Sequence, residues 1–367
     1  MSKVLILSAS FGEGHNAAAR NLREALVLRD PEGKAVISDP FLETYGDVNR
    51  FFQKAYVSLI NNAPALWQMA FDALDRTRVV ERHMVMHGSV ERMLFKLLDD
   101  LKPDVVVSTY PGCNHLLDHM YRRRLTRPFV TATIVTDSLT INSVWYRAFS
   151  DYFIVANTDT EKVMLEAGVP AAKLRTLGFP VPRTYGEFSG LRVTPPANGK
   201  WKVLYVINSG RGLAPSIVHE LLKLDNIELS VTVGRDEKLG DSIRDVAAKS
   251  GHEVEIHGWT PHMPRLMAES HLVISKAGGA TVQETLAAKT PMIITQIVPG
   301  QEEGNARLLI ENDAGALATT PADIASTVFS AFADGGARWN DWLFNVEKLS
   351  RPNASDEVAE FILGLSR

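Results

Sequence analysis

The chain has 367 residues, of which 45% are hydrophobic and 22% are charged, a balance typical of a globular protein with two domains of ordinary size. Its net charge of -4 at pH 7 argues against general nucleic-acid binding, because phosphate neutralisation needs a basic excess. The single cysteine, Cys113, excludes an internal disulfide framework. No apolar run approaches the ~20 residues that span a bilayer, and the first residues do not resemble a signal peptide, so we expect a cytoplasmic protein.

In the first half, short β-rich runs alternate with amphipathic stretches. Buried parallel strands are predicted for KVLIL (3–7), AVIS (35–38), DVVVST (104–109), FVTATIV (129–135) and DYFIVA (151–156). A helix is predicted from Ala17 to Leu28, because Leu22, Ala25 and Leu26 have helical spacing. Residues 48 to 98 predict a long, mostly helical region.

The stretch Gly178–Lys200 is rich in proline and glycine and lacks periodicity, which predicts a linker. A second series of strands is predicted for WKVLYVI (201–207), IELSVTVG (227–234), EVEIHG (253–258), HLVIS (271–275) and PMIITQ (291–296). The predicted fold is therefore α/β, with two Rossmann-like doubly wound domains facing a central cleft. The domains cover residues 1–183 and 201–367, with a linker at 184–200, and the last helix is a candidate to pack back on the first domain.

The opening stretch VLILSASFGEGHNAAARNLREAL joins a strand, a Gly-rich turn and a helix. Gly12, Gly14 and Ala17 match the G-x-G-x-x-A dinucleotide fingerprint, and Asp39 after the second strand could serve an NAD ribose. That interpretation does not explain His15. At the start of a helix an imidazole is kept neutral, so His15 is a candidate general base, and a histidine without chemistry is the alternative.

Asp137 follows the strand predicted at 129–135 and therefore lies at a carboxyl end of the sheet. It is a candidate to orient His15 or to be the base itself. The structural alternative is a cap on the following turn, through Asp137 or Ser138.

The second half contains a strand, a turn with Gly278 and Gly279, and a helix that begins near Ala280. Unpaired N–H groups at a helix start suit a diphosphate. Glu284 lies about one turn further along, where a carboxylate can accept hydrogen bonds from ribose hydroxyls.

A glycine-rich loop follows the next strand and carries several polar residues, which suit the hydroxyls of a sugar. They are Gln301, Glu302 and Asn305.

The pattern G-G-x-T-x-x-E (278–284) followed by P-x-Q-E-x-x-N (299–305) resembles the family of monogalactosyldiacylglycerol synthases and processive diacylglycerol glucosyltransferases, relatives of the enzyme that transfers N-acetylglucosamine to lipid I. SASFGEGHNAAA, YVSLINNAPALWQMAF, VTDSLTINSVW and LGFPV are similar to the same family. The resemblance implies a GT-B fold, a UDP-sugar donor in the C-terminal domain and a lipid acceptor in the N-terminal one. It also implies inversion at the anomeric carbon and no metal or other cofactor.

The resemblance also implies roles for single residues. Glu284 would bind the ribose, Gln301 and Glu302 the hexose, and the backbone near Thr260 the uracil edge. The diphosphate would be bound by Gly278, Gly279, Ala280 and Thr281, with Ser209 and Gly210 on its other side. Candidates for acceptor or membrane contact are Gly12, Gly14, Trp67, Arg76 and Trp145.

Two histidine pairs, His83/His87 and His115/His119, have the i,i+4 spacing of metal ligands on a helix. Neither has a third ligand nearby in the sequence and no D-x-D motif occurs, so ordinary helix-surface histidines are predicted. Residues 50 to 95 mix aromatic and basic positions, and YRRRLTR (121–127) is basic. This composition favours an interfacial membrane surface, and a core-facing helix with a solvated basic edge is the alternative.

The predicted function is an inverting transfer of a hexose from a UDP-sugar to a lipid, with diacylglycerol the favoured acceptor. The protein would bind peripherally to an anionic surface at the cytosolic face of the cell membrane, without a nucleic-acid partner. The alternatives are an enzyme that handles UDP-N-acetylglucosamine, either an epimerase or a lipid-I-type transferase, and a nucleotide-sugar-binding regulator without catalysis.

Overall fold

The computed structural model describes the chain except residues 78–79, 81–87, 123–125, 192, 198 and 367. Contacts divide the chain into two compact units, each built on a six-stranded sheet. Unit 1 comprises Met1–Arg183, Val298–Gly304 and Asn353–Arg367. Unit 2 comprises Thr184–Ile297 and Asn305–Pro352.

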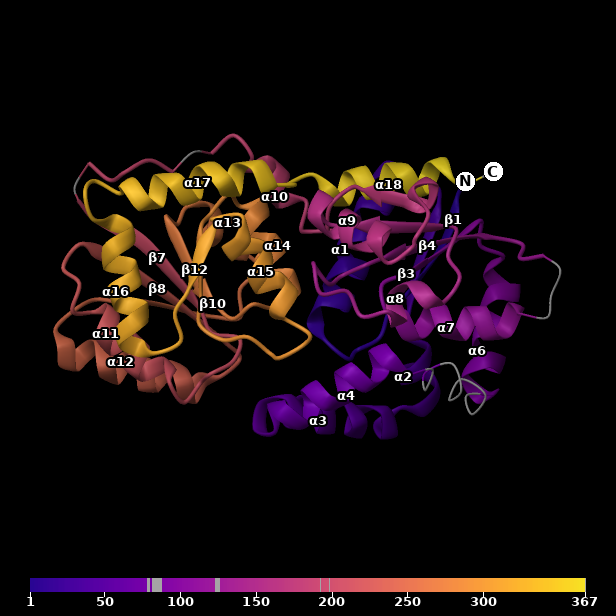
Figure 1. Ribbon diagram of the computed structural model, residues 1–367, viewed down its shortest axis with the longest axis horizontal. Coiled ribbons are helices and arrows are strands. Elements are labelled where there is room, and N and C mark those ends of the chain that lie inside the picture. The colour runs from indigo at the N-terminus through magenta and orange to yellow at the C-terminus, as the bar shows by residue number, and fades with distance from the viewer. Residues whose placement is uncertain (78–79, 81–87, 123–125, 192, 198, 367) are drawn as a thin grey trace. The chain divides into compact units, whose positions relative to one another are not determined.

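The sheet of unit 1 is parallel throughout, with the order β2-β1-β3-β4-β5-β6 (Figure 1). Its strands are β1 (Lys3–Leu7), β2 (Lys34–Ser38), β3 (Val105–Ser108), β4 (Val130–Ile134), β5 (Tyr152–Val155) and β6 (Leu174–Thr176). Strands buried on both faces form continuous apolar runs, and this is why the sequence predicted five of them. The edge strand β6 was missed because three residues give no recognisable pattern.

Helices cover both faces of this sheet. Val4 and Ile6 of β1 point to one face and pack with α1 and α18, whereas Leu5 and Leu7 point to the other and pack with α6 and α7. This alternation is the two-residue period of a strand. The helices are α1 (Glu13–Arg29), α2 (Pro40–Tyr45), α3 (Asp47–Asn62), α4 (Pro64–Arg76), α6 (Gly88–Leu101), α7 (Pro111–Tyr121), α8 (Val144–Arg147), α9 (Thr158–Glu166), the 3-10 turn η2 (Ala171–Lys173) and α18 (Ala354–Gly364).

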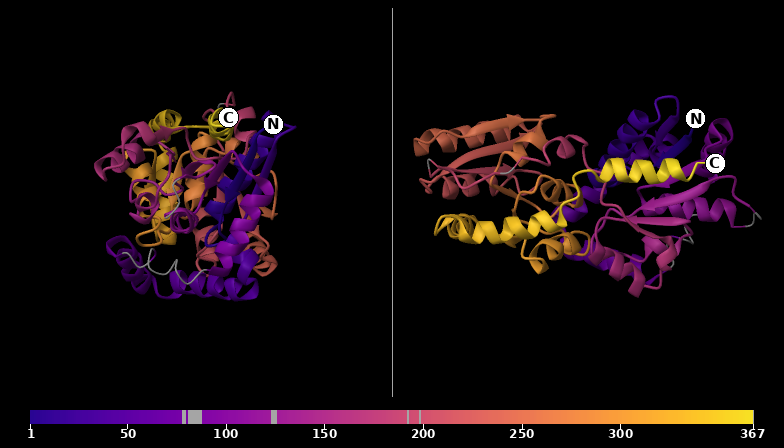
Figure 2. Two further views of the ribbon diagram at one scale, coloured as in Figure 1. Left: turned by 90° about the vertical axis from the view of Figure 1, so that its right-hand side faces the viewer. Right: turned by 90° about the horizontal axis from the view of Figure 1, so that it is seen from above.

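The last helix, α18, lies against α1 in unit 1 (Figure 2, yellow). Asp356 of α18 accepts hydrogen bonds from Arg29 of α1 and from Arg183. These ion pairs are partly exposed and contribute little, so the apolar contact of Val358 and Ile362 with α1 provides most of the stabilisation.

The sheet of unit 2 is also parallel, with the order β12-β11-β10-β7-β8-β9. Its strands are β7 (Trp201–Val206), β8 (Ile227–Gly234), β9 (Glu255–Gly258), β10 (Leu272–Ser275), β11 (Met292–Ile294) and β12 (Gly315–Leu317). Only the short edge strand β12 was not predicted. The helices are α10 (Thr184–Glu187), α11 (Ala214–Leu221), α12 (Glu237–Ser250), α13 (Met263–Ala268), α14 (Gly279–Ala287), α15 (Glu303–Glu311, beginning in the segment grouped with unit 1), α16 (Pro321–Phe332) and α17 (Ala337–Leu349).

Aromatic packing closes one end of the unit 2 core. The Trp201 ring stacks on Phe332 with centroids 4.3 Å apart and meets Trp339 edge-on at 5.2 Å. Part of the predicted linker also packs into this unit, because Tyr185 of α10 is buried and its hydroxyl lies 3.1 Å from the sulfur of Met267. Within the part of the chain that the structure describes, no helix combines the length and the apolar character needed to cross a membrane.

Candidate functional site

Three neighbouring strands of unit 1 bring candidate groups together at their carboxyl ends. His15 follows β1, Tyr110 follows β3 and Asp137 follows β4, and these strands are adjacent in the sheet. Gly12 is the N-cap of α1, so His15 lies in the first turn of that helix. Residues distant in the sequence therefore share one end of the sheet, where ligands bind in open α/β folds.

The His15 ring is buried, with 8% of the residue exposed. Its Nδ1 atom lies 3.0 Å from the hydroxyl of Thr136, and the Tyr110 ring meets it edge-on at 5.2 Å. Burial lowers the pKa of His15 to about 4, partly offset by a hydrogen bond with the backbone of Thr109. The ring is therefore neutral at pH 7, and the main cause is burial rather than the helix start considered from the sequence.

The two nitrogens of the His15 ring have different roles, and Nδ1 is the one that faces the Thr136 hydroxyl. When Nδ1 carries the proton, Nε2 holds the lone pair that a base needs. A Cβ atom at Gly12 would lie 3.9 Å from Nε2, and the φ of Gly12 is 145°, a value that favours glycine. Gly12 thus keeps this edge of the ring free of a side chain.

Asp137 bonds to Trp145, with Nε1 donating to Oδ2 at 2.7 Å. Burial raises the pKa of Asp137 to about 6, and the bond from Trp145 opposes this shift. The side chain bonded to His15 is Thr136, the residue before Asp137. Trp145 was a candidate for acceptor or membrane contact, but it is 1% exposed and its indole supports Asp137 from the interior.

Asp39, the candidate for an NAD ribose, has a structural role. One carboxylate oxygen accepts from the backbone N–H and the hydroxyl of Ser10, and the other caps α2 through the N–H of Leu42, each at 2.9 Å. Both oxygens therefore fix the loops after β1 and β2. The dinucleotide interpretation loses its ribose ligand.

The segment Val298–Gly304, which carries Gln301 and Glu302, groups with unit 1. Glu302 is buried, and its carboxylate accepts from the N–H of Val298 at 3.0 Å. The hydroxyl of Thr140 donates to the carbonyl of Gly300 at 3.4 Å. Within unit 1 this loop lies beside the turn that follows Asp137, and the Glu302 carboxylate shapes the loop itself.

In unit 2, the polar residues again lie at the carboxyl ends of strands that sit together in the sheet, here β11, β10 and β7. The hydroxyl of Ser209, after β7, donates to Oε1 of Gln296, after β11, at 2.8 Å. The amide of Asn208 donates to the hydroxyl of Thr281 at 3.1 Å. Asn305 is buried and donates to the carbonyl of Ala277 at 3.1 Å, so it holds the turn before α14.

The remaining donor candidates also lie in unit 2. Gly278 is the N-cap of α14 and Glu284 lies half-buried on that helix, while Thr260 follows β9. The pKa of the Tyr185 hydroxyl is raised well above its usual range, first by burial and then by the charge of Glu284. The Thr260 hydroxyl accepts from the N–H of His262 at 3.1 Å, which fixes the loop after β9.

Sequence reasoning missed four residues of these clusters. They are Tyr110, Thr136, Asn208 and Gln296. Each lies at the end of a predicted strand or directly after it, which is the signal that singled out Asp137. Applied to every strand, that signal would have found all of them.

The histidine pairs do not form metal sites in the described residues. His115 is buried, with Nε2 2.9 Å from the carbonyl of Val144, and His119 lies 3.3 Å from Glu91. The expectation of a surface position is therefore wrong for His115, whose packing requires the interior. His83 and His87 lie outside the described residues, and the residues that the structure does describe contain no cluster of three potential metal ligands.

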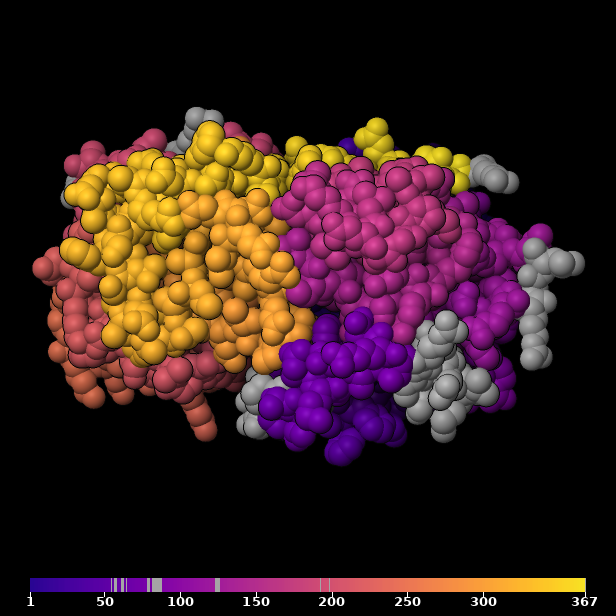
Figure 3. Space-filling view, in the orientation of Figure 1, coloured from indigo at the N-terminus to yellow at the C-terminus, as the bar shows by residue number. Residues whose placement is uncertain are grey.

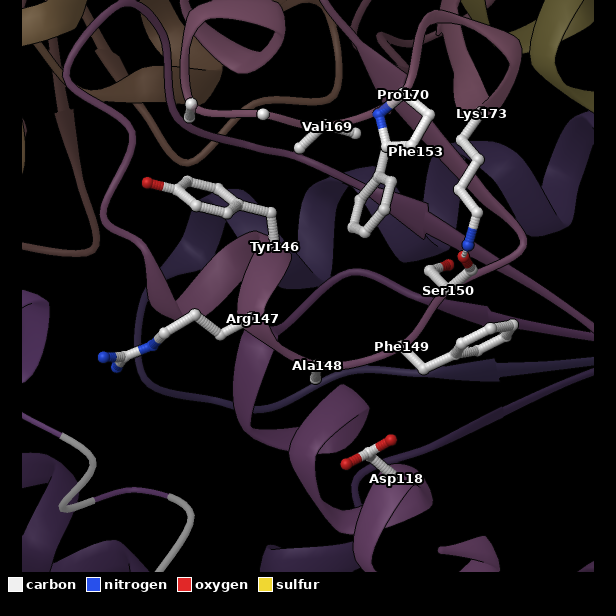
Figure 4. Close-up of a pocket in the computed structure, with 12 residues that line it drawn as sticks. Asp118, Tyr146, Arg147, Ala148, Phe149, Ser150, Phe153, Val169, Pro170 and Lys173 are labelled. Carbon is white, nitrogen blue, oxygen red and sulfur yellow. Dashed lines mark hydrogen bonds between the residues drawn. The ribbon is translucent and has the colours of Figure 1, made fainter.

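Unit 1 also contains a pocket of about 370 Å³ beside the loop that enters β5 (Figure 4). Tyr146, Phe149 and Phe153 line it, and Lys173 donates to the carbonyl of Ser150 at 2.8 Å. This pocket lies at the amino end of β5. None of the residues predicted for the site lines it.

Helices α3 and α4 lie on the surface of unit 1 (Figure 3, indigo to violet). They expose several large apolar side chains. Phe51 is 68% exposed and Phe52 58%, and the others are Val48, Leu66 and Met69. Trp67 is half-buried with its ring 6.1 Å from Phe71, whereas Arg76 is exposed in the last turn of α4. Arg78, Arg82 and residues 123–125 of the predicted basic surface lie outside the described residues.

Two family models match the chain in succession. Residues 15–181 match the monogalactosyldiacylglycerol (MGDG) synthase family, and residues 213–320 match the glycosyltransferase family 28 C-terminal domain. The first range contains His15 and Asp137, and the second contains the turn at Gly278 and Glu284.

Relatives align over nearly the whole chain. The processive diacylglycerol beta-glucosyltransferase of Bacillus subtilis (strain 168) is 24% identical over 375 residues, which are 98% of this chain and 94% of that protein. Monogalactosyldiacylglycerol synthase 3, chloroplastic, of Arabidopsis thaliana is 24% identical over 385 residues, which are 99% of this chain and 81% of that protein.

Solved structures share the fold. MurG of Acinetobacter baumannii matches with a TM-score of 0.63 and 16% identity, covering 99% of this chain and 100% of MurG. The UDP-GlcNAc 2-epimerase of Neisseria meningitidis, bound to UDP-GlcNAc, matches with a TM-score of 0.62 and 15% identity at the same coverage. The predicted GT-B class is thereby confirmed. The two family models and the relatives that align over nearly the whole chain make it similar to MGDG synthases and processive diacylglycerol glucosyltransferases.

Proposed function

We propose that this chain transfers a hexose from a UDP-sugar to diacylglycerol in a single displacement that inverts the anomeric carbon. The observation that carries the proposal is the group of buried His15 and Thr136 with half-buried Asp137 at the carboxyl end of the first sheet. The relatives of this chain are named diacylglycerol glycosyltransferases. Neutral His15 and the high-pKa carboxyl of Asp137 are both suited to proton transfer.

On the acceptor side, the attacking hydroxyl must lose its proton as the new bond forms. Nε2 of His15 can take this proton while Nδ1 stays hydrogen-bonded to Thr136. Asp137 is the alternative base, and its pKa of about 6 lies closer to neutral pH than that of His15. Gly12, which places no side chain against the ring, and Gly14 are proposed to contact the acceptor.

On the donor side, the residues of unit 2 would hold the nucleotide. The start of α14, from Gly278 through Gly279 and Ala280 to Thr281, would bind the diphosphate with backbone N–H groups, beside Ser209 and Gly210. The same donors stabilise the charge of departing UDP without a divalent metal. Glu284 would bind the ribose and the backbone near Thr260 the uracil, with Asn305 supporting the turn at Ala277. Gln301 and Glu302, which belong to the segment Val298–Gly304, are proposed for the hexose, and one Glu302 oxygen also accepts from the N–H of Val298.

Replacing Glu284 with alanine should weaken UDP binding by about 1.5–3 kcal/mol, because a charge-assisted hydrogen bond to the ribose is lost. Calorimetry of UDP binding measures the change. Glu311→Ala, which removes an exposed carboxylate at the end of α15, is the matched control and should leave the affinity unchanged. Unchanged affinity in the Glu284 variant would remove this residue from the donor site.

We also propose that the exposed apolar residues of α3 and α4, together with Arg76, bind the anionic cytosolic face of the cell membrane. Exposed aromatic side chains with neighbouring arginines are typical of interfacial surfaces. Each arginine near an anionic surface contributes about 1 kcal/mol, and salt weakens this attraction.

Vesicles with anionic lipid should therefore sediment the protein at low ionic strength and release it at high ionic strength. Replacing both Phe51 and Phe52 with serine should reduce sedimentation at least tenfold, because burial of each ring contributes about 1.5–3 kcal/mol. Phe344→Ser, an equally exposed aromatic change on α17 of unit 2, should have no effect. Equal sedimentation by neutral vesicles at every salt concentration would contradict the electrostatic contribution.

Incubation of the protein with a panel of radiolabelled UDP-sugars and a mixed lipid extract tests the function as a whole. The expected product is a labelled glycolipid whose sugar identifies the donor. Epimerisation of free UDP-N-acetylglucosamine at C2 would instead indicate an epimerase, and binding without turnover would indicate a regulator.

A further inference from the structure

We propose that Gln296 binds the diphosphate of the donor nucleotide, with Ser209 fixing the orientation of its amide group. The inference rests on the proposed UDP-sugar site and adds a ligand-binding residue to it. Gln296 lies just after β11, outside both sequence motifs that indicated the donor site.

The position of the bond between these residues follows from the sheet. Ser209 follows β7 and Gln296 follows β11, and β10 lies between those two strands. Neighbouring strands are about 4.8 Å apart, so the 2.8 Å hydrogen bond spans the carboxyl end of β10. The turn at that end leads directly into α14. The Gln296 amide is therefore held beside the helix start at which the diphosphate is proposed to bind.

The chemistry of the amide determines what it can offer a ligand. A glutamine side chain has one carbonyl acceptor and an NH₂ group with two donors. The Ser209 hydroxyl donates to the carbonyl. Among the described residues this is the only hydrogen bond of the Gln296 side chain, which is half-buried and reachable from solvent. The NH₂ donors remain for a ligand, and a diphosphate consists of acceptors.

Two neighbouring features support this arrangement. Asn208 donates to the oxygen of the Thr281 hydroxyl, which leaves the hydroxyl proton of Thr281 for another acceptor. Gly210 has a φ of 67°, and a Cβ there would lie 3.5 Å from Oε1 of Gln296. The chain turns beside the amide in a conformation that favours glycine, and this turn brings Ser209 within reach.

The test is calorimetry of UDP and of uridine with Gln296→Met, which keeps the side-chain length and removes the donors. UDP affinity should fall about ten- to hundredfold, because a hydrogen bond to a charged group is lost, whereas uridine affinity should stay within about twofold. Gln296→Glu should weaken UDP binding further through repulsion. Ser209→Ala should weaken it less, because the amide stays but is no longer oriented.

Asn226→Asp is the charge control, since it adds the same negative charge at the amino end of β8. It should leave UDP affinity unchanged. Circular dichroism verifies folding, and if Gln296→Glu does not fold, the uncharged Gln296→Met decides the question.

The outcomes separate the two proposals. Wild-type protein that fails to bind UDP overturns the donor site itself, and the role of Gln296 with it. Wild-type binding with unchanged UDP affinity in Gln296→Met overturns the role of Gln296 alone. Equal losses of UDP and uridine affinity would mean that the side chain supports local packing, which also overturns it.

Discussion

Replacing His15 with alanine should lower kcat by about 10²–10⁴-fold, the usual contribution of general-base catalysis. The ring is buried and neutral, and its Nδ1 is hydrogen-bonded to Thr136, so Nε2 is the atom that can accept the acceptor's proton. UDP affinity should stay within a few-fold of wild type, because the residues proposed for nucleotide binding at Gly278–Thr281 and Glu284 belong to unit 2. Steady-state kinetics with diacylglycerol and UDP calorimetry measure both quantities.

His119→Ala is the matched control, because His119 is a partly exposed histidine of the same unit that pairs with Glu91. It should keep normal turnover. Near-normal turnover in His15→Ala would leave His15 only a role in shaping the loop, and the base would then have to be Asp137.

Replacing Asp137 with asparagine should lower kcat comparably if the carboxylate is the base or orients the acceptor with His15. If the two residues act as a unit, the double variant should be little worse than either single variant.

The pH dependence of kcat/KM in the wild type separates the two bases. A base with the pKa of Asp137 gives activity that rises with pH and reaches half its maximum near pH 6. A base with the pKa of His15 gives a midpoint near pH 4. A midpoint near 6 that disappears in Asp137→Asn would assign the base to Asp137.

The substitution Asp137→Asn should also increase the free energy of unfolding at neutral pH. The folded protein holds the Asp137 proton up to about pH 6, whereas the unfolded chain releases it near the ordinary pKa of 3.8. The contribution of the Asp137 carboxyl group to the free energy of unfolding is therefore fully present below pH 3.8 and is lost as the pH rises through 6. The asparagine variant avoids this loss, which amounts to about 3 kcal/mol at about pH 7.5. Urea unfolding at about pH 7.5 and at about pH 4 should show the gain only at the higher pH.

Much of the fold followed from local patterns. An apolar run followed by a Gly-rich stretch, as in VLILSASFGEGH, defines a strand and its turn without reference to the rest of the chain. The parallel strands were found because burial on both faces makes them continuous apolar runs. β6 and β12 were missed because three-residue edge strands take their structure from a neighbour that lies far away in the sequence.

For the candidate sites, too, the sequence predicted positions along the chain but not the contacts of the side chains. Glycines and polar residues after strands indicated His15, Asp137 and the turn at Gly278, because a parallel sheet gathers the ends of its strands at one edge. The sequence did not indicate what each side chain would bond to. The burial of Trp145 depends on residues of β5 with which it packs, and His115 meets the carbonyl of Val144 in α8, 29 residues away.

By itself, the sequence determined the α/β class, most of the strands and the loops that carry the candidate chemistry, because each depends on residues close together in the chain. The tertiary structure alone decided that Thr136 contacts His15 across 121 residues, that Ser209 holds Gln296 across 87, and that α18 packs in unit 1. Burial in the folded protein also lowers the pKa of His15 and raises the pKa of Asp137. These features arise from contacts and desolvation between segments that are distant in the sequence. Hydrophobic periodicity indicates only which face of a segment is buried, and it does not indicate which residues that face contacts.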